Sequence, residues 1–224
     1  MTLRAASPSP SALHGQLVVL LRWPAPLRCK RRLAVGVGPV RAAAIQARLA
    51  MHVLQVAAEV CRRLSGSPGL GRIESVLAVS GLGPRAADRW GRACGLSRTV
   101  LQGEGGLGVR LMRQVRRARR QGASAVVLIG GDLPELAGAD LAEAFRLLRH
   151  HPVVLGPAGD GGYWLIGLRD ASPQLFAGAA SAIAWGSARV LQQTVEACAT
   201  CGLTPAWLPQ RCDLDRPADL ARWR

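Results

Sequence analysis

The chain has no long apolar run, and this absence excludes a membrane-spanning segment at the sequence level. The longest early apolar run, Leu17–Leu21, is far too short to cross a bilayer and is closed by Arg22 and Pro24. We therefore expect no membrane span and a cytoplasmic location.

The six cysteines also lack the regular spacing of disulfide-rich proteins and are scattered along the chain. This excludes a small disulfide scaffold and indicates a reducing compartment. Cys198 and Cys201 form a single CxxC pair without a second pair to complete a zinc site, so we interpret them as incidental thiols.

Lysine is almost absent, since Lys30 is the only one in a chain of formal net charge +15. The basic side chains are otherwise arginine, and their field should attract polyanions such as nucleotides. The single lysine indicates a position where a compact ammonium is needed. Aromatic residues make up only 4% of the chain and no recognition motif accompanies the charge, so nucleic-acid binding is not expected as the main function.

The 224 residues are 49% hydrophobic, enough for one domain with a full core. We expect residues 1–15, rich in Ser, Pro and Ala at their start, to be a disordered N-terminal extension, and residues 16–224 to form the domain.

Strand-like and helix-like segments alternate along the chain, which is typical of an α/β fold with a mainly parallel sheet flanked by helices. The predicted strands are Leu17–Leu21, Ser75–Val79, Ala125–Ile129, Val153–Leu155, Tyr163–Leu168 and Leu203–Leu208. The predicted helices are Val40–Leu64, Pro84–Ala93, Leu107–Gln121, Ala139–Arg149, Ser187–Ala199 and Pro217–Trp223.

The segment AVVLIGGD is an unbroken aliphatic run that stops at two glycines and Asp132. Such a run predicts a strand buried on both faces of a parallel sheet, where ligands bind beyond the carboxyl end. The segment PVVLGPAGDGGYWLIGL repeats the design around Asp160, with Gly161 and Gly162 allowing a ligand to approach the backbone. We expect the two strand ends to share one acidic pocket.

A basic, proline-stiffened loop, RWPAPLRCKRRL, follows the first predicted strand. It gathers positive charge at the ligand-binding end of the sheet, as a phosphate-binding loop requires. A basic surface loop is the alternative.

The segment LQGEGGLGVRL contains a literal GxGxxG at Gly103, Gly105 and Gly108. A dinucleotide-binding motif would be compatible with Asp132 as the ribose ligand. Against it, the preceding strand would span only about Thr99–Gln102, and the motif lies in the middle of the chain rather than opening a new βαβ half. The same residues resemble the GGxGxRL loop of sugar-nucleotide nucleotidylyltransferases. In either case the helix that begins at Leu107 can receive an anion at its amino terminus.

Asp132, at a strand end beside a polyphosphate, would suit Mg²⁺ or Mn²⁺, hard ions that take one or two carboxylates and phosphate oxygens. Turn aspartates without a ligand are the alternative for Asp132 and Asp160. Near the end of the chain, Asp215 is expected to cap the short helix that follows it.

Five ordered blocks over residues 17–220 resemble a family of bacterial glycosyltransferase-like proteins of the A-type fold, first known as a domain of unknown function. Its relatives include the guanylyltransferases of phospholactate and molybdenum-cofactor pathways. The blocks are RWPAPLRCKRRL, QGEGGLGVRL, IGGDLPEL, LGPAGDGGYWLIGL and, after Trp185, DLDRPADL.

The resemblance implies a single-domain nucleotide-diphospho-sugar transferase fold with a site for a nucleotide sugar or a nucleoside triphosphate. It places Lys30 and Arg32 on the family's basic pair and Asp132 on its strand-end acid. Arg22 replaces the usual lysine. Leu27 replaces a glycine, Arg31 a threonine and Gly106 an aspartate, and the loss of that acid would reduce or alter activity.

The expected function is metal-assisted glycosyl transfer from a nucleotide-diphospho-sugar to a small acceptor. Asp132 and Asp160 are the expected catalytic residues, and Asp132 the expected ligand of Mg²⁺ or Mn²⁺. The residues expected to bind the nucleotide are Arg22, Lys30, Arg32, Gln102, Gly103, Gly161 and Gly162. Nucleotidylyl transfer with release of pyrophosphate is the nearest alternative, and a non-catalytic nucleotide or nucleic-acid binder is the second.

Overall fold

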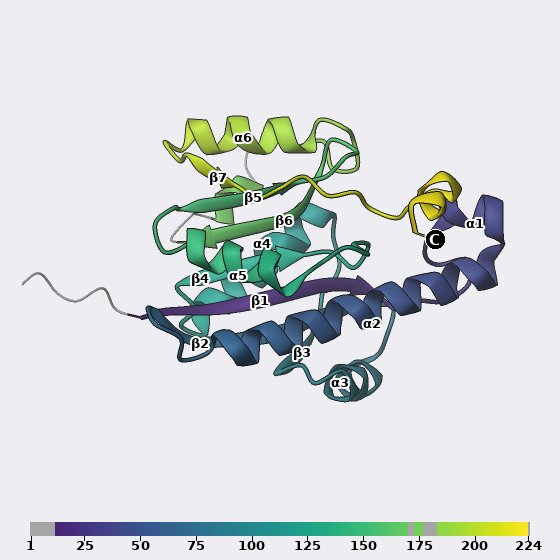
Figure 1. Ribbon diagram of the computed structural model, residues 1–224, viewed down its shortest axis with the longest axis horizontal. Coiled ribbons are helices and arrows are strands. Elements are labelled where there is room, and N and C mark those ends of the chain that lie inside the picture. The colour runs from purple at the N-terminus through teal and green to yellow at the C-terminus, as the bar shows by residue number, and fades with distance from the viewer. Residues whose placement is uncertain (1–11, 170–172, 177–182, 224) are drawn as a thin grey trace, which may run out of the picture.

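The computed structural model describes residues 12–169, 173–176 and 183–223 and is built on one central sheet (Figure 1). The strands occur in the spatial order β3-β2-β1-β4-β6-β5-β7. They are β1 Leu13–Arg22, β2 Leu70–Ser80, β3 Arg98–Leu101, β4 Ala125–Ile129, β5 Val153–Pro157, β6 Tyr163–Arg169 and β7 Pro205–Trp207.

The sheet is mainly parallel, as expected. β1 pairs in parallel with β2 and β4, β2 with β3, and β5 with β7, whereas β6 runs antiparallel to β4 and β5. The turn between β5 and β6 is too short for a crossover, so β6 must fold back beside β5. The carboxyl ends of β1, β4 and β5 therefore lie at the same edge of the sheet.

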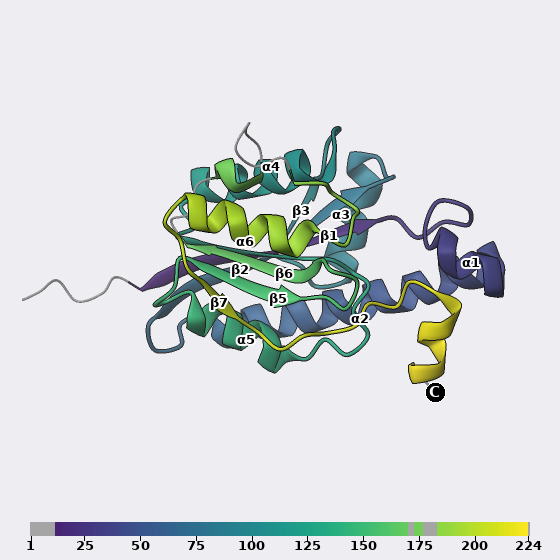
Figure 2. The ribbon, with the colours of Figure 1, turned by 90° about the horizontal axis from the view of Figure 1, so that it is seen from above.

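Helices cover both faces of the sheet (Figure 2). On β1, Leu17, Val19 and Leu21 pack with residues of α2, α3 and α5, while Val18 joins the core that contains residues of α4 and α6. This alternation explains the unbroken apolar run, because both faces of the strand are buried. The helices are α1 Arg31–Val37, α2 Pro39–Leu64, α3 Pro84–Ala93, α4 Leu107–Arg120, α5 Gly138–Leu147 and α6 Val190–Thr200.

The first strand begins earlier than the expected domain boundary at residue 16. Leu13 is buried and pairs with Leu70 of β2, so residues 13–15 belong to the sheet and not to an N-terminal extension. Residues 1–11, on which the rest of that expectation falls, lie outside the described residues.

β3 and η1 were not among the elements expected from the sequence, and α1 and η2 also differ from the prediction. α1 was not expected, because Gly36 lies within it and Gly38 ends it; it is held by burial of Leu33 in a small cluster with Leu49 and Leu214. The segment expected as a terminal helix, Pro217–Trp223, is the 3₁₀ helix η2. Tertiary packing rather than local propensity decides both. A second 3₁₀ helix, η1, spans Pro173–Phe176.

Within the described residues, no helix combines the length and the apolar character that crossing a bilayer requires. The 26-residue α2 is amphipathic, with one face in the core and basic residues on the other.

Gln102 joins the carboxyl ends of three strands at the functional edge. It follows β3, is buried, and donates two hydrogen bonds of 2.9 Å from Nε2 to the carbonyl oxygens of Leu21 in β1 and Ala78 in β2. Its Oε1 accepts a bond of 3.1 Å from Arg110 of α4. Gln102 therefore fixes the position of the loop that precedes α4.

We expect Gln102→Leu to lower the free energy of unfolding by about 2 kcal/mol, because its buried partners lose their hydrogen bonds to the amide. Denaturant unfolding would measure this loss. Gln192→Leu is the matched control, since the exposed Gln192 amide donates to Glu196 on the outer face of α6. Equal stability of the two variants would contradict the joining role of Gln102.

Candidate functional site

A cleft of about 290 Å³ opens at the carboxyl ends of β1 and β4. Its walls come from the end of β1, the loop before α1, the β4 end and the C-terminal segment. The lining residues are Leu20, Leu21, Arg22, Arg28, Cys29, Lys30, Gln46, Gly130, Gly131, Asp132 and Asp215. The basic loop and the strand-end aspartate predicted from the sequence thus meet in one cavity.

Lys30 and Asp132 form an ion pair of 2.9 Å between Nζ and Oδ1. The Lys30 side chain is 2% exposed, whereas the Asp132 side chain is 46% exposed. Lys30 also donates a hydrogen bond to the carbonyl oxygen of Leu214. The lysine is therefore held inside the protein, while its carboxylate partner keeps one side open to the cleft.

The loop that carries Lys30 has an unusual backbone conformation. Lys30 precedes α1 with φ 46° and ψ 44°, in the left-handed region that a side chain with Cβ seldom adopts. Leu27, three residues earlier, also has a positive φ of 65°. A glycine would adopt this conformation freely, which agrees with the glycine that the resembling family carries there.

Of the other two expected basic residues, Arg22 lines the cleft and Arg32 does not. Arg22 lines the cleft and donates to the carbonyl oxygen of Arg28 over 3.3 Å. Arg32 is not among the lining residues and pairs at 3.0 Å with Asp215, both side chains being well exposed. Arg22 and Lys30 thus face the cleft, and Arg32 lies at its rim.

Gln102 and Gly103 hold the loop before α4 together. The side-chain amide of Gln102 is hydrogen-bonded through both its nitrogen and its oxygen. Arg113 donates to the backbone carbonyl oxygen of Gln102. Gly103 has φ 74°, and a Cβ there would lie 2.6 Å from Nη1 of Arg113. Direct contact of either residue with a nucleotide stays a prediction.

Gly106, where the resembling family has an acid, is the N-cap of α4. A Cβ added at Gly106 would meet no atom within 4 Å. Packing therefore leaves room for an aspartate, so the loss of the acid is a chemical change rather than a steric one.

Asp160 and its two glycines form the turn between β5 and β6. Oδ1 of Asp160 accepts a bond of 3.0 Å from the N–H of Gly162. Gly161 has φ 87°, and a Cβ there would lie 2.2 Å from the carbonyl oxygen of Ala188. The close approach expected from a ligand at Gly161 is thus made by the chain itself, and ligand contact at this turn stays a prediction.

Asp213 is a residue of the site that the sequence analysis did not single out. Burial raises the pKa of its carboxyl to about 7, assisted by repulsion from Asp132 and Asp160 and opposed by Lys30. Three carboxyl groups from distant segments therefore influence one another at this edge. The crowding of negative charge favours a bound cation.

Asp215 does not cap the following element, contrary to expectation. The N–H groups of Asp215 and Arg216 both donate to Oδ2 of Asp219, at 2.9 and 2.7 Å. The carboxylate of Asp215 pairs instead with Arg32.

The carboxylate groups at the cleft suit a divalent cation that also binds a ligand. They do not suit a cation held by protein groups alone. The described part of the chain contains no group of three or more His, Cys, Asp or Glu side chains arranged to hold a metal ion. Mg²⁺ commonly takes one or two carboxylates together with substrate phosphate oxygens. The half-exposed carboxylate of Asp132 can serve in such a set.

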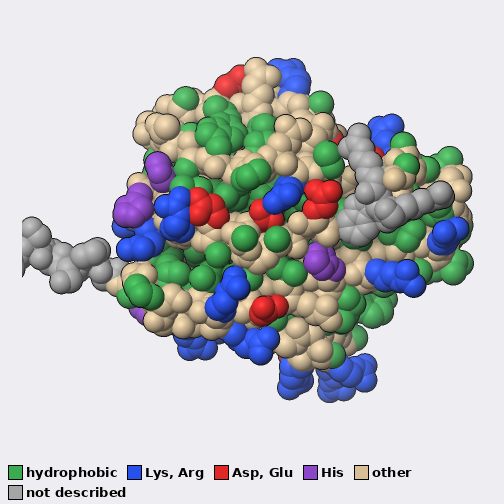
Figure 3. Space-filling view, viewed as in Figure 1, with side chains coloured by type: hydrophobic (Ala, Val, Ile, Leu, Met, Phe, Trp, Pro, Cys, Tyr) green, Lys and Arg blue, Asp and Glu red, His purple; other side chains and the backbone are tan. Residues whose placement is uncertain are grey.

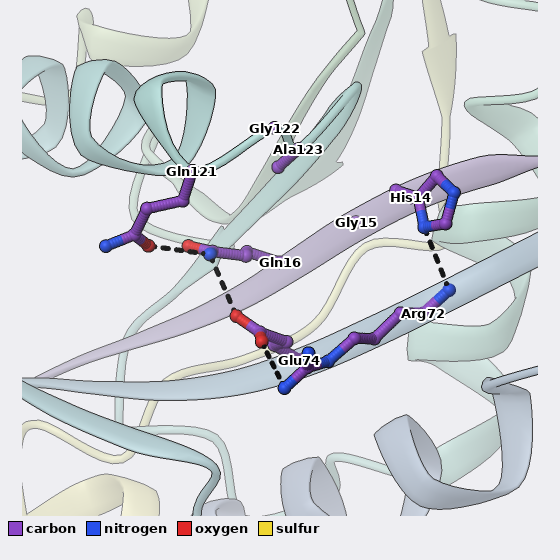
Figure 4. A pocket seen from close by; sticks show the side chains of 8 residues that line it. All are labelled: His14, Gly15, Gln16, Arg72, Glu74, Gln121, Gly122 and Ala123. Atoms are coloured by element: carbon purple, nitrogen blue, oxygen red, sulfur yellow. Dashed lines mark hydrogen bonds and ion pairs between the residues drawn. The ribbon is translucent and has the colours of Figure 1, made fainter.

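A second, smaller pocket of about 120 Å³ lies at the opposite end of the sheet, near the start of β1 (Figure 4). Its polar groups are bonded to one another: Gln16 donates to Gln121 and Glu74, and Glu74 pairs with Arg72 at 2.7 Å. Because these groups satisfy each other, the pocket is not the candidate site.

The match to a protein-family model covers residues 66–187, just over half of the chain. The model describes an uncharacterized protein conserved in bacteria (DUF2064). It includes Gln102, Asp132 and Asp160, while the Lys30 loop and Asp213 lie outside the matched residues.

Solved structures share the fold. A protein of Desulfovibrio desulfuricans G20, described as a nucleotide-diphospho-sugar transferase, is 28% identical with a TM-score of 0.75, over 90% of this chain and 82% of that one. Glucosyl-3-phosphoglycerate synthase from Mycobacterium tuberculosis, in complex with Mn²⁺, UDP and glucosyl-3-phosphoglycerate, is 13% identical with a TM-score of 0.56, over 99% and 81%. CMP:2-keto-3-deoxy-manno-octonic acid synthetase with CTP is 13% identical with a TM-score of 0.54, over 93% and 96%.

The matched length settles the family, and the likeness over nearly the whole chain settles the fold. The chain belongs to the DUF2064 family of uncharacterized bacterial proteins and has the fold of the nucleotide-diphospho-sugar transferases.

Proposed function

We propose that the protein is a metal-assisted glycosyltransferase that uses a nucleotide-diphospho-sugar donor. The observation that carries the proposal is the Lys30–Asp132 pair at the carboxyl edge of a parallel sheet, facing a cleft with Arg22. A cation and a carboxylate side by side match the opposite charges of a diphosphate and its divalent ion.

Arg22 and Lys30 would hold the donor diphosphate, with Arg32 adding positive charge from the rim. Lys30 neutralises Asp132 in the ligand-free protein. With a cation at Asp132, the Lys30 ammonium would be free to donate to phosphate oxygens from its buried, preorganised position. Little side-chain entropy is then lost on binding, because Lys30 is already ordered.

Asp132 would be the protein ligand of Mg²⁺ or Mn²⁺, and a bound ion would offset the charge that develops on the leaving diphosphate. Asp160, with Gly161 and Gly162, would shape the acceptor side, where its carboxylate can accept the proton of an attacking hydroxyl group. The likeness to the Desulfovibrio protein, described as a nucleotide-diphospho-sugar transferase, favours a sugar donor.

Nucleotidylyl transfer is the second candidate, because a synthetase in complex with CTP shares the fold over 96% of its length. The same basic groups would then stabilise the departure of pyrophosphate from a nucleoside triphosphate. Product analysis separates the two: release of pyrophosphate from a triphosphate would exclude glycosyl transfer as the primary reaction.

We expect Asp132→Asn to lower metal-dependent nucleotide affinity at least about tenfold, because the carboxylate contact to the cation is lost. The variant should also lose roughly 1–2 kcal/mol of stability, since the buried Lys30 ammonium keeps only its bond to Leu214. Thermal shift with UDP- and GDP-sugars, with and without Mn²⁺, measures both. Asp88→Asn, which removes an exposed ion pair on α3, is the control. An unchanged Mn²⁺-dependent shift in Asp132→Asn would refute the metal role.

We expect Lys30→Met to weaken binding of nucleoside diphosphates roughly tenfold to a hundredfold, because a charge-assisted hydrogen bond to phosphate is lost. Affinity for the nucleoside should be unchanged, and methionine retains most of the buried side-chain volume. Calorimetric titration of both ligands measures the difference. Arg31→Met, an exposed cation beside Lys30, is the control. Parallel losses for nucleoside and diphosphate would remove Lys30 from the phosphate site.

The raised pKa of Asp213 predicts how the free energy of unfolding depends on pH. Its folded pKa of about 7 lies above the ordinary value of 3.8, so the folded state binds more protons between these values and stability falls as pH rises through that window. Asp213→Asn should remove this fall and add roughly 1–2 kcal/mol above pH 7. Denaturant unfolding across the window measures the slope. The same slope in the variant would contradict the assignment.

A further inference from the structure

One end of the molecule carries the most exposed aliphatic side chains of the described residues. Leu27 is 76% exposed, Val35 87% and Val40 71%. They lie in the loop before α1, on α1 and in the first turn of α2. We call the segment 26–48 the tip; α1, the start of α2 and η2 gather there, beyond the carboxyl end of β1 (Figures 1 and 2).

The tip combines these apolar side chains with an excess of positive charge. No acidic residue occurs before Glu59 in the sequence. The exposed cations of the tip are Arg28, Arg31, Arg32, Arg41 and Arg48. In the space-filling view, hydrophobic and basic side chains lie next to each other at this end (Figure 3).

The acidic side chains that η2 and the preceding segment bring to this end are already engaged. Asp215 pairs with Arg32, and Asp219 accepts two backbone N–H groups. Among the described residues, Arg32 is therefore the arginine of the tip that has an ion-pair partner.

Between α2 and η2 lies a groove of about 570 Å³ whose floor is apolar. Ile45, Leu49, Leu214 and Leu220 line it, and Arg41 and Arg48 border it. Leu214 also accepts the Lys30 ammonium, so the groove adjoins the candidate active site. An apolar channel flanked by two guanidinium groups matches an amphiphile with an anionic head group.

Leu27 provides a second observation at the tip, since its backbone is strained and its side chain is exposed. A leucine at φ 65° is strained, and here the strain is not relieved by burial. A glycine would remove the strain and the exposed side chain together.

We propose that the tip docks on an anionic lipid bilayer, with Leu27, Val35 and Val40 inserted at the level of the head groups and the arginines bound to lipid phosphates. Apolar insertion and electrostatic attraction combine in this way in interfacial proteins. A second copy of the chain is disfavoured as the occupant, because it would bring two sets of arginines together. The inference does not depend on which reaction the cleft performs.

The test is co-sedimentation of the full chain with vesicles of phosphatidylcholine alone or mixed with phosphatidylglycerol. We expect binding to the anionic vesicles, weakened by salt, and little binding to the neutral ones. Val35→Asp combined with Val40→Asp should lower the partition coefficient by about tenfold or more, since two apolar contacts become repulsive. Leu107→Asp, which changes an exposed leucine at the start of α4, should leave it unchanged.

Leu27→Gly gives a second readout that does not depend on the double variant folding. It should weaken vesicle binding several-fold while leaving the melting temperature unchanged or higher, because the strain is relieved. If the role of Leu27 were purely structural, vesicle binding would not fall while the melting temperature stayed the same or rose.

Three outcomes would overturn the proposal. The first is failure of the wild-type chain to bind anionic vesicles at low salt, and the second is vesicle binding that the tip variants do not change. The third is self-association or binding to a nucleic-acid duplex, without vesicle binding, that Val35→Asp combined with Val40→Asp abolishes.

Discussion

The functional edge of this protein depends on one buried ammonium group. Lys30 is bonded to Asp132 at the end of β4 and to the carbonyl oxygen of Leu214, while the N–H of Leu214 donates to the carbonyl oxygen of Asp132 at 3.0 Å. Three segments far apart in the sequence are thereby joined around one charge. An unpaired ammonium at this depth would be costly, so the charge and the local fold stabilise each other.

The sequence predicted a mainly parallel sheet flanked by helices and the meeting of Lys30 with Asp132, but neither the strand order nor β3. Aliphatic runs that stop at glycine and aspartate mark strand ends, and parallel strands bring those ends to one edge. Periodicity did not predict α1, because its seven residues include a glycine and depend on the burial of Leu33 against α2 and the C-terminal segment. Helices this short are stabilised by packing rather than by propensity.

The finer roles within the site depend on contacts that local pattern does not encode. Nucleotide binding by Gln102 stays a prediction, and the sequence did not indicate that its amide joins three strands, which depends on the register of β1, β2 and β3. Asp213 was missed because its raised pKa arises first from burial and then from repulsion by carboxylates that include Asp132 and Asp160, and both depend on the folded structure. Asp215 was expected to cap the last helix, but its carboxylate pairs with Arg32, a residue of the first helix and 183 positions away in the sequence.

The contact between Lys30 and Leu214 spans 184 positions of the chain. Ribosomes deliver residues in order, and the sheet strands that flank β1 are available long before the segment that holds Lys30 in place. A nascent chain could therefore complete most of its hydrophobic core while the cleft still lacks one wall. Ligand recognition in this protein should consequently be a late event of biosynthesis, acquired only after the scaffold has formed.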